Sequence, residues 1–272
     1  MPYLMRGRNE SAVYYEAVYD VGPARRWLKA YNRGHADRAT LFHLLLYACT
    51  VALHARPGLN RFVSGGRLYQ HREVSVSFAA KTQMRDEAPF ATVKLVFPRD
   101  ETFPGAVRRI AAAVEEGRRG PARSVDREVA LVVRLPHLLI RLAVGLARLL
   151  DRWNLLPGFM IRNDPMYASL FLANLGSVGL SDTFHHLYEY GTVSIFGVMS
   201  APRLTARADR GGTTVYEGLQ MRWTLDERIN DGYYCAASLR IAQQILEDPE
   251  RFLGSPEAPE IPSAEARAAL FG

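Results

Sequence analysis

The sequence predicts an α+β fold, in which helices and strands occupy different parts of the chain and do not alternate regularly. Helical patterns dominate the early part, short alternating strands follow, and longer strand-like segments come late. No internal repeat with a period of about 20–50 residues is visible, which excludes solenoids and propellers. No Gly-x-Gly-x-x-Gly fingerprint follows a strand and no P-loop motif occurs, so no dinucleotide or P-loop nucleotide site is indicated.

The chain begins with one strand and two helices. Val13–Val21 is rich in aromatic and β-branched residues, which favour strands. A helix is predicted over Pro23–Asn32, because proline is well tolerated in the first helical turn. Thr40 is a good N-cap for the strongly apolar helix 41–55, which ends before Pro57.

Short strands and a third helix come next. Leu59–Ser64 and Arg67–Gln70 flank a Gly-Gly turn and form a predicted hairpin. Val74–Thr82 and Ala91–Phe97 have the residue pattern of half-buried strands. The next predicted elements are a helix over Pro104–Glu116 and a Gly/Pro/Arg-rich loop over Gly117–Arg123.

Val129–Trp153 is the most apolar segment of the chain. Arg134, Arg141 and Arg148 are seven residues apart, so on a helix they form one basic stripe surrounded by apolar residues. These arginines and Pro136 argue against a membrane-spanning helix. Two interpretations stay open: a helix or helix pair packed on the core, or an amphipathic surface that lies on a membrane or shields an acyl-binding pocket.

The part of the chain after Pro157 favours strands, and a last helix is expected to stop at Asp248-Pro249. The tail after Gly254 is rich in Pro, Ala and Glu and is expected to be loosely held. The predicted elements are strands over Tyr167–Ala173, Thr192–Met199, Arg203–Ala208 and Thr214–Thr224, and a helix over Tyr233–Leu246.

Composition narrows the class of protein. Apolar residues make up 48% of the 272 residues, enough for a substantial core, and 23% charged residues exclude a disordered chain. The net charge of +6 comes without a basic block that contains aromatic residues, so no nucleic-acid partner is expected. Cys49 and Cys235 cannot form a disulfide framework or a metal cage, and no metal site is predicted. The chain does not begin with an apolar signal core, so we expect a cytoplasmic protein.

Two short segments carry most of the functional information. Leu225–Gly232 (LDERINDG) lies between a predicted strand and a predicted helix, and Ala173–Gly179 (ANLGSVG) follows the end of a strand. Taken separately, Asp-Gly after a strand is usually a turn, and Asn-Leu-Gly is usually a strand end. A close run of Asp, Glu, Arg and Asp is usually a solvent-exposed turn whose charged side chains pair with one another. Each segment alone therefore has a purely structural explanation.

Together these segments resemble the acyltransferase core of 2-oxoacid dehydrogenase complexes and, more distantly, chloramphenicol acetyltransferase. Asn174-Leu175-Gly176 is similar to the family's Asn-Leu-Gly, and Leu225–Gly232 to its Asp-His-Arg-x-x-Asp-Gly. The resemblance implies a chloramphenicol-acetyltransferase-like fold, with a mixed or mainly antiparallel sheet flanked by helices. Further similarities are Arg56–Asn60 to the family's Pro-x-Leu-Asn helix end, Gly66–Ser77 to its short strand pair, and Leu246–Pro249 to its Leu-Glu-x-Pro.

The resemblance also implies a catalytic arrangement, which this chain departs from. In the family a histidine takes the proton of the attacking thiol and a Ser or Thr hydroxyl stabilises the oxyanion, at a site between the subunits of a trimer. The histidine falls on Glu227, the hydroxyl residue on Ala173, or on Asn174 if the register slips by one, and an Asp or Asn on Asp231. A carboxylate is a weaker base than an imidazole, and losing an oxyanion donor costs about 3 kcal/mol. The family reaction is therefore expected to be altered or impaired.

Other residues complete the predicted site. Ser177 joins Ala173 and Asn174 as a candidate for the substrate channel. The resemblance also implies a structural ion pair that involves Asp231, with Arg6, Arg8 and Arg228 as the candidate arginines. The simplest interpretation of His185-His186 is a histidine pair whose hydrogen bonds are satisfied by its surroundings. His186 is also an alternative candidate for the base, and the spacing suggests no third ligand for a metal.

The resemblance implies one core over residues 1–254, an apolar helical insertion at about 124–157, and the tail 255–272. The expected function is a stand-alone acyltransferase-like protein that binds acyl-coenzyme A or another thioester and transfers the acyl group with altered catalytic residues. The alternative is a catalytically degenerate trimeric scaffold, cage or ligand-binding protein, and contact with a membrane surface is a third possibility. No covalently bound cofactor is expected, and a coenzyme A thioester is the expected substrate. The expected assembly is a homotrimer or a cage of trimers.

Overall fold

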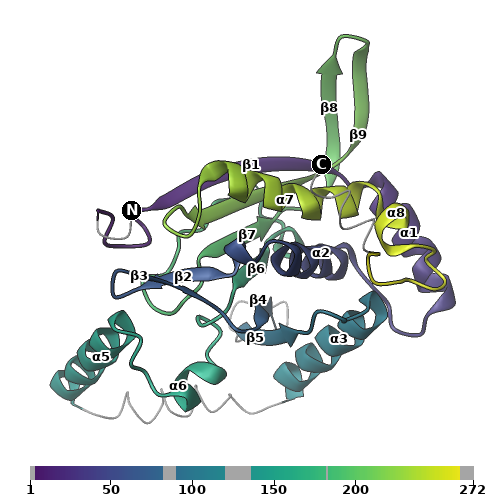
Figure 1. Cartoon of the computed structure of the whole chain (residues 1–272). Helices are drawn as coiled ribbons and strands as arrows, with labels where there is room; N and C mark the ends of the chain where they lie inside the picture. Colours follow the sequence, from purple (N-terminus) through teal and green to yellow (C-terminus); the bar gives the residue numbers. More distant parts are fainter. Residues whose placement is uncertain (1–3, 82–89, 120–135, 182, 264–272) are drawn as a thin grey trace.

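A seven-stranded mixed sheet forms the centre of the molecule (Figure 1). The computed structural model describes residues 4–81, 90–119, 136–181 and 183–263. The strands of the sheet are β1 (Ala12–Asp20), β4 (Val74–Lys81), β5 (Phe90–Phe97), β6 (Leu170–Asn174), β7 (Ile195–Met199), β8 (Arg203–Asp209) and β9 (Gly212–Asp226). Their order is β1-β9-β7-β6-β4-β5, and β8 pairs with β9. β6 is parallel to β4 and β7, and the other neighbours are antiparallel, as the predicted mixed sheet requires.

The helices and the sheet enclose one main hydrophobic core, and a smaller cluster covers the other face of the sheet. Successive residues of β6 show the division, because Leu170 and Leu172 belong to the main core and Phe171 to the smaller cluster. The helices are α1 (Gly22–Gly34), α2 (Leu41–Ala55), α3 (Phe103–Arg119), α5 (His137–Arg152), α6 (Gly158–Arg162), α7 (Gly232–Glu247) and α8 (Pro249–Leu253). A separate hairpin is formed by β2 (Arg61–Ser64) and β3 (Arg67–Gln70), and short 3-10 turns by η1 (Pro57–Leu59) and η2 (Gly176–Val178).

Helix α2 is the central helix of the core. It is apolar almost all round, and nine of its fifteen residues are buried. Thr40 and His43 form a capping box at its start, which confirms Thr40 as the predicted N-cap. The helix packs mainly on α7 and also contacts α3 and β4. The turn that follows it lies beside the β9–α7 connection, because the Asn230 amide donates to the Gly58 carbonyl.

One predicted boundary is wrong, and one short helix was not predicted. The predicted loop from Gly117 begins too early, because α3 continues to Arg119, and the rest of that loop lies outside the described residues. Helix α7 ends at Glu247, so it stops at Asp248-Pro249 as predicted, but it is not the last helix: Pro249 opens α8, because the Asp248 side chain accepts a hydrogen bond from the Arg251 N–H (3.3 Å) and caps the new helix.

The tail after Gly254 is described as far as residue 263. The Glu260 N–H donates to the Leu253 carbonyl (2.8 Å), and Pro262 is buried. This part of the tail therefore lies against the body of the protein.

The described part of the apolar segment is helix α5, which stands at the periphery of the molecule (Figure 1). None of its residues is buried, so this part of the segment lies at the surface and is not enclosed by the core. Residues 129–135 of the segment lie outside the described residues. Across the described ranges, no helix combines the length and apolar composition needed to cross a membrane.

Candidate functional site

The loop between β9 and α7 holds the predicted base position. Asp226 ends β9, is fully buried, and forms a bidentate ion pair with Arg228, with Nε–Oδ1 and Nη2–Oδ2 distances of 2.8 and 2.7 Å. Ser11, just before β1, donates to the same carboxylate (3.0 Å). The start of the loop is therefore fixed by a desolvated ion pair that also holds the N-terminal segment.

The end of the loop is fixed by a helix cap and by the turn after α2. Asp231 caps α7, because its carboxylate accepts the Tyr234 N–H at 2.7 Å. Asn230 donates its side-chain amide to the Gly58 carbonyl at 2.6 Å. A Cβ on Gly58 would lie 2.5 Å from that amide nitrogen, so a larger residue would displace the Asn230 side chain. Two segments singled out by the sequence, residues 56–60 and 225–232, thus meet in the structure.

Among the residues that the structure describes, the implied ion pair of Asp231 with Arg6, Arg8 or Arg228 is not found. Arg228 pairs with Asp226, and its Nη1 also donates to the carbonyls of Met5 and Arg6. The guanidinium of Arg8 is buried and donates to the Tyr188 carbonyl (2.9 Å) and to the Gly191 carbonyl. The physical reason is that Asp226 is the buried acid that needs a countercharge, whereas the exposed Asp231 carboxylate caps α7.

Glu227 lies between these anchors, and it is less buried than the residues on either side of it. Its neighbours Asp226, Arg228 and Ile229 are buried, whereas Glu227 is half-buried. Its backbone N–H donates to the Ser11 carbonyl at 3.0 Å. The backbone is thus held firmly while the carboxylate stays within reach of a ligand from solvent.

The Ala173–Ser177 segment forms a tight turn at the end of β6. Asn174 accepts the Ser177 N–H on its side-chain oxygen (3.2 Å), and the Ser177 hydroxyl donates to the Asn174 carbonyl (2.7 Å). A Cβ on Gly176 would lie 2.4 Å from the Ala201 nitrogen, which explains the glycine. Ala173, half-buried against the smaller cluster, supplies no hydroxyl.

Within one chain, Glu227 and the Ala173–Ser177 turn lie at opposite ends of the strands of the sheet. β6 and β7 are parallel, so Asn174 is paired with Met199 at the C-terminal end of β7. β9 is antiparallel to β7, so Leu225 is paired with Ile195 at the other end. Glu227 therefore does not meet Ala173, Asn174 or Ser177 in one chain.

The histidine pair lies beside β9. His185 stacks on Phe196 (4.0 Å between centroids) and its carbonyl accepts the Thr224 hydroxyl (2.5 Å). Burial lowers the pKa of His185. His186 is exposed, and its Nδ1 donates to the Leu187 carbonyl (2.9 Å). The pair is thus satisfied by local contacts, although Thr224 is only three positions before Glu227.

Ser11 and Asn230 were not among the sequence-predicted site residues, although they hold the loop. No local signal marks Ser11, because it contacts Asp226 only through the β1–β9 pairing. Both cysteines are buried, and burial raises the pKa of the Cys49 thiol to about 12 and that of Cys235 to about 11. Neither is therefore a reactive nucleophile. Among the residues that the structure describes, no group of three metal-ligating side chains is placed to hold a metal.

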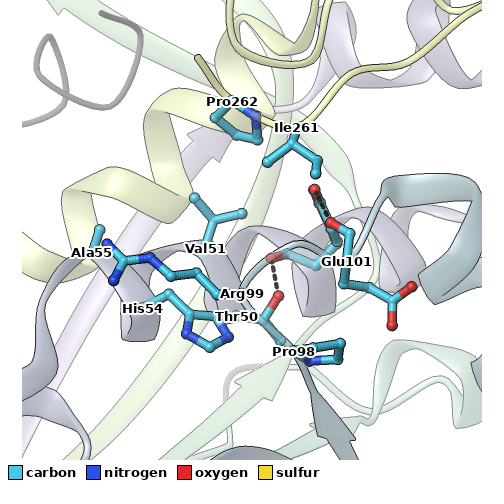
Figure 2. A pocket seen from close by; sticks show the side chains of 10 residues that line it. Thr50, Val51, His54, Ala55, Pro98, Arg99, Glu101, Ile261 and Pro262 are labelled. Atoms are coloured by element: carbon cyan, nitrogen blue, oxygen red, sulfur yellow. Dashed lines mark hydrogen bonds between the residues drawn. The ribbon is translucent and has the colours of Figure 1, made fainter. Parts of the chain in front are cut away.

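A small pocket lies apart from this loop, between α2, the β5–α3 connection and the tail (Figure 2). His54 contacts the Phe97 carbonyl (2.9 Å) there, and Tyr47 donates to the Glu101 carbonyl (2.9 Å). Ile261 and Pro262 close one side. None of the predicted site residues is among the residues that line it.

Comparison with known proteins identifies the fold. No family model matches the chain, and no curated protein matches it in sequence. The cubic core of the pyruvate dehydrogenase multienzyme complex is 14% identical with a TM-score of 0.63, over 92% of this chain and 85% of that chain. The Azotobacter vinelandii dihydrolipoamide acetyltransferase, whose catalytic mechanism was investigated through a serine, a histidine and an asparagine, is 14% identical with a TM-score of 0.61 over the same shares.

A chloramphenicol acetyltransferase is also similar, at 14% identity and a TM-score of 0.52, over 91% of this chain and 92% of that chain. The chain therefore has the chloramphenicol-acetyltransferase-like fold of these acyltransferase cores. This confirms the fold that the sequence motifs predicted.

Proposed function

We propose that this chain binds an acyl thioester such as an acyl-coenzyme A, and that Glu227 faces the ligand as the residue that accepts a proton. The observation that carries the proposal is the half-buried Glu227, flanked by the buried Asp226 and Arg228, at the end of β9 in an acyltransferase fold. Rigid flanking residues favour catalysis because they hold a reacting group in one position. No covalently bound cofactor is required, since the thioester itself carries the acyl group.

In the proposed step, the Glu227 carboxylate takes the proton from an acceptor thiol as its sulfur attacks the thioester carbonyl. The tetrahedral intermediate then expels the donor thiolate, which receives the proton. Ala173 has no hydroxyl to donate to the oxyanion, so we expect turnover to be slow. Unless another donor takes its place, the oxyanion loses about 3 kcal/mol of stabilisation. The missing hydroxyl favours a second candidate function, a catalytically degenerate trimeric scaffold, cage or ligand-binding protein.

The site is proposed to be completed in a homotrimer, alone or within a cage of trimers. The separation of Glu227 from Ala173–Ser177 within one chain supports this, because a neighbouring subunit could supply the missing half. In this proposal, residues 1–254 of each subunit form a single core that carries an apolar helical insertion at about 124–157.

A thiol-release assay with a panel of acyl-coenzyme A donors, together with calorimetric binding of coenzyme A, tests the function. Glu227→Gln keeps the size of the side chain and removes the base, so we expect turnover to fall about 100-fold or more with binding retained. The matched control is Glu116→Gln, on the exposed surface of α3, which should leave turnover unchanged.

Glu227→His combined with Ala173→Ser should raise turnover, because it restores both groups used by the resembled family. Binding without turnover for any donor would establish the degenerate alternative. Absence of coenzyme A binding by the intact oligomer would overturn the thioester proposal itself.

A further inference from the structure

Helix α5 carries a large apolar surface that the fold leaves uncovered. The most exposed of its apolar side chains, on α5 and the segment after it, are those of Leu138 (68%), Leu142 (61%), Leu146 (57%), Leu149 (54%), Trp153 (58%), Leu155 (64%) and Phe159 (79%). Five of them, from Leu138 to Trp153, are spaced three or four residues apart and therefore share one side of the helix. We call these five residues the leucine face.

The polar side of α5 is basic. Arg141, Arg148 and Arg152 are exposed and recur at intervals of seven and four, which puts them in one row beside the leucine face. The acidic residue of the helix, Asp151, points elsewhere, because its carboxylate accepts the Tyr167 hydroxyl (2.5 Å) and the Gly191 N–H (3.3 Å). The outward surface of α5 therefore combines apolar and positive side chains without a negative one.

The C-terminal end of α5 is tied to the body, which fixes how the helix faces. The Ser64 hydroxyl donates to the Asp151 and Arg152 carbonyls at 2.9 and 3.1 Å, in addition to the two contacts of the Asp151 carboxylate. Ile140, Ala147 and Leu150 are half-buried and lie toward the side of the helix that carries Asp151. Turning the leucine face inward would break these contacts, so the fold holds it outward.

We propose that the leucine face docks on an anionic lipid surface, with α5 lying in the plane of the membrane interface. A helix with leucines and an aromatic side chain on one side and arginines on the other is suited to this position, because apolar side chains enter the acyl boundary while guanidinium groups reach lipid phosphates. Charge complementarity selects the partner: the row of arginines fits anionic headgroups, whereas against a second copy of this helix it would meet another row of arginines. The inference is independent of the proposed function, since it uses no residue of the β9–α7 loop.

Flotation of the full chain with vesicles tests the proposal. We expect flotation with vesicles that contain phosphatidylglycerol, and weaker flotation with phosphatidylcholine alone or at high salt. Arg141→Glu with Arg148→Glu should reduce binding to the anionic vesicles at least about ten-fold. The matched reversal Arg26→Glu with Arg33→Glu, on exposed positions of α1, changes the net charge equally and should retain most of the binding.

Replacing leucines on the exposed face gives a second test that does not depend on charge alone. Leu142→Ser with Leu149→Ser should abolish flotation and leave the thermal unfolding temperature unchanged, because both side chains are exposed. Tryptophan emission should shift to the blue on binding through Trp153, since Trp27 and Trp223 are buried. Glu227→Gln should float like the wild type, which separates this proposal from the function.

Three outcomes would overturn the lipid proposal. The first is no flotation with either vesicle, and the second is flotation that the α5 variants leave unchanged. The third combines two results. The Leu142→Ser, Leu149→Ser variant sediments with a lower mass than the wild type in the absence of lipid, and the wild type does not bind vesicles. That result would assign the leucine face to contacts between copies of the chain.

Discussion

His71 shows how a half-buried side chain with a buried ring nitrogen makes stability depend on pH. It packs against Phe62, with ring centroids 4.6 Å apart, and burial lowers its pKa to about 4. The positive charges of Lys94 and Arg8 act in the same direction, whereas a backbone hydrogen bond with Thr192 opposes them. His71 is therefore neutral in the folded protein at pH 7, while in the unfolded chain it titrates near 6.5.

We predict that this histidine makes the fold less stable in mild acid. Its folded pKa is below the unfolded value, so its stabilising effect is complete above about pH 6.5 and is lost as pH falls toward 4. The expected loss is at most about 3 kcal/mol. Urea unfolding of His71→Phe should show a shallower dependence on pH over this range than the wild type, even if the variant is less stable at pH 7.

The control for this prediction is His137→Gln, at the exposed start of α5, which should keep the wild-type dependence. Equal pH dependence for wild type and His71→Phe would show that another group carries the acid sensitivity. His43 is the first alternative, because burial lowers its pKa to about 4 and its Nδ1 accepts the Thr40 N–H at the start of α2.

At the level of elements, the β9–α7 connection is a loop held in place by acidic residues at its two ends. Two acidic residues five positions apart have different partners: Asp226 neutralises the buried Arg228, and Asp231 caps a helix. The loop between them is consequently held at both ends. Its stability depends mainly on the buried pair, since an exposed cap contributes less than a desolvated charge.

We predict a large difference between two substitutions in this connection. Asp231→Ala should lower the free energy of unfolding by about 1 kcal/mol, the usual effect of losing an N-cap. Asp226→Ala should lower it by about 3–5 kcal/mol, because it leaves the Arg228 charge buried and unpaired. Adding Arg228→Met to Asp226→Ala should recover part of the loss. Equal effects of the two single substitutions in urea would contradict the assignment of the buried pair.

At the scale of the whole molecule, one edge of the sheet is left open. Val13, Tyr14 and Tyr15 at the start of the edge strand β1 are 43%, 52% and 39% exposed. Successive residues of a strand point to opposite faces, so both faces are uncovered there. Phe184 packs edge-on against Tyr14 and is itself 41% exposed. Open apolar edges are a liability in isolated chains, which supports an oligomer.

We predict that this edge lies in the proposed trimer interface. The wild type should sediment with three times the mass of one chain, or as multiples of that unit. Tyr14→Glu with Phe184→Glu should yield monomers, because it places negative charges in an apolar contact. Leu142→Glu on α5 is the control and should leave the sedimentation mass unchanged. A wild type that sediments as a monomer would contradict the trimer and the shared site.

Local patterns in the sequence were sufficient for most elements of the fold. The apolar run before Pro57 predicted α2, and the β-branched alternation of residues 74–82 predicted β4 as far as the described residues extend. The start of α8 was missed because Pro249 serves equally well to end one helix or to begin the next. For the site, the motif predicted which residues form the loop, whereas the catalytic roles of Glu227, Asp231 and His186 stay predictions.

The sequence by itself determined the α+β class and the order of most elements, and its resemblance to an acyltransferase family predicts Glu227 and Ala173 at the positions of that family's histidine and hydroxyl. The class and the element order follow from residue identity and short-range periodicity, which do not depend on distant contacts. Only the tertiary structure decided that Arg228 pairs with Asp226, that Glu227 and Ala173 lie at opposite ends of the sheet, and that α5 keeps its leucines outside. The physical reason is that countercharges and burial depend on which strands pair across the sheet, and that pairing is set by contacts between residues far apart in the chain.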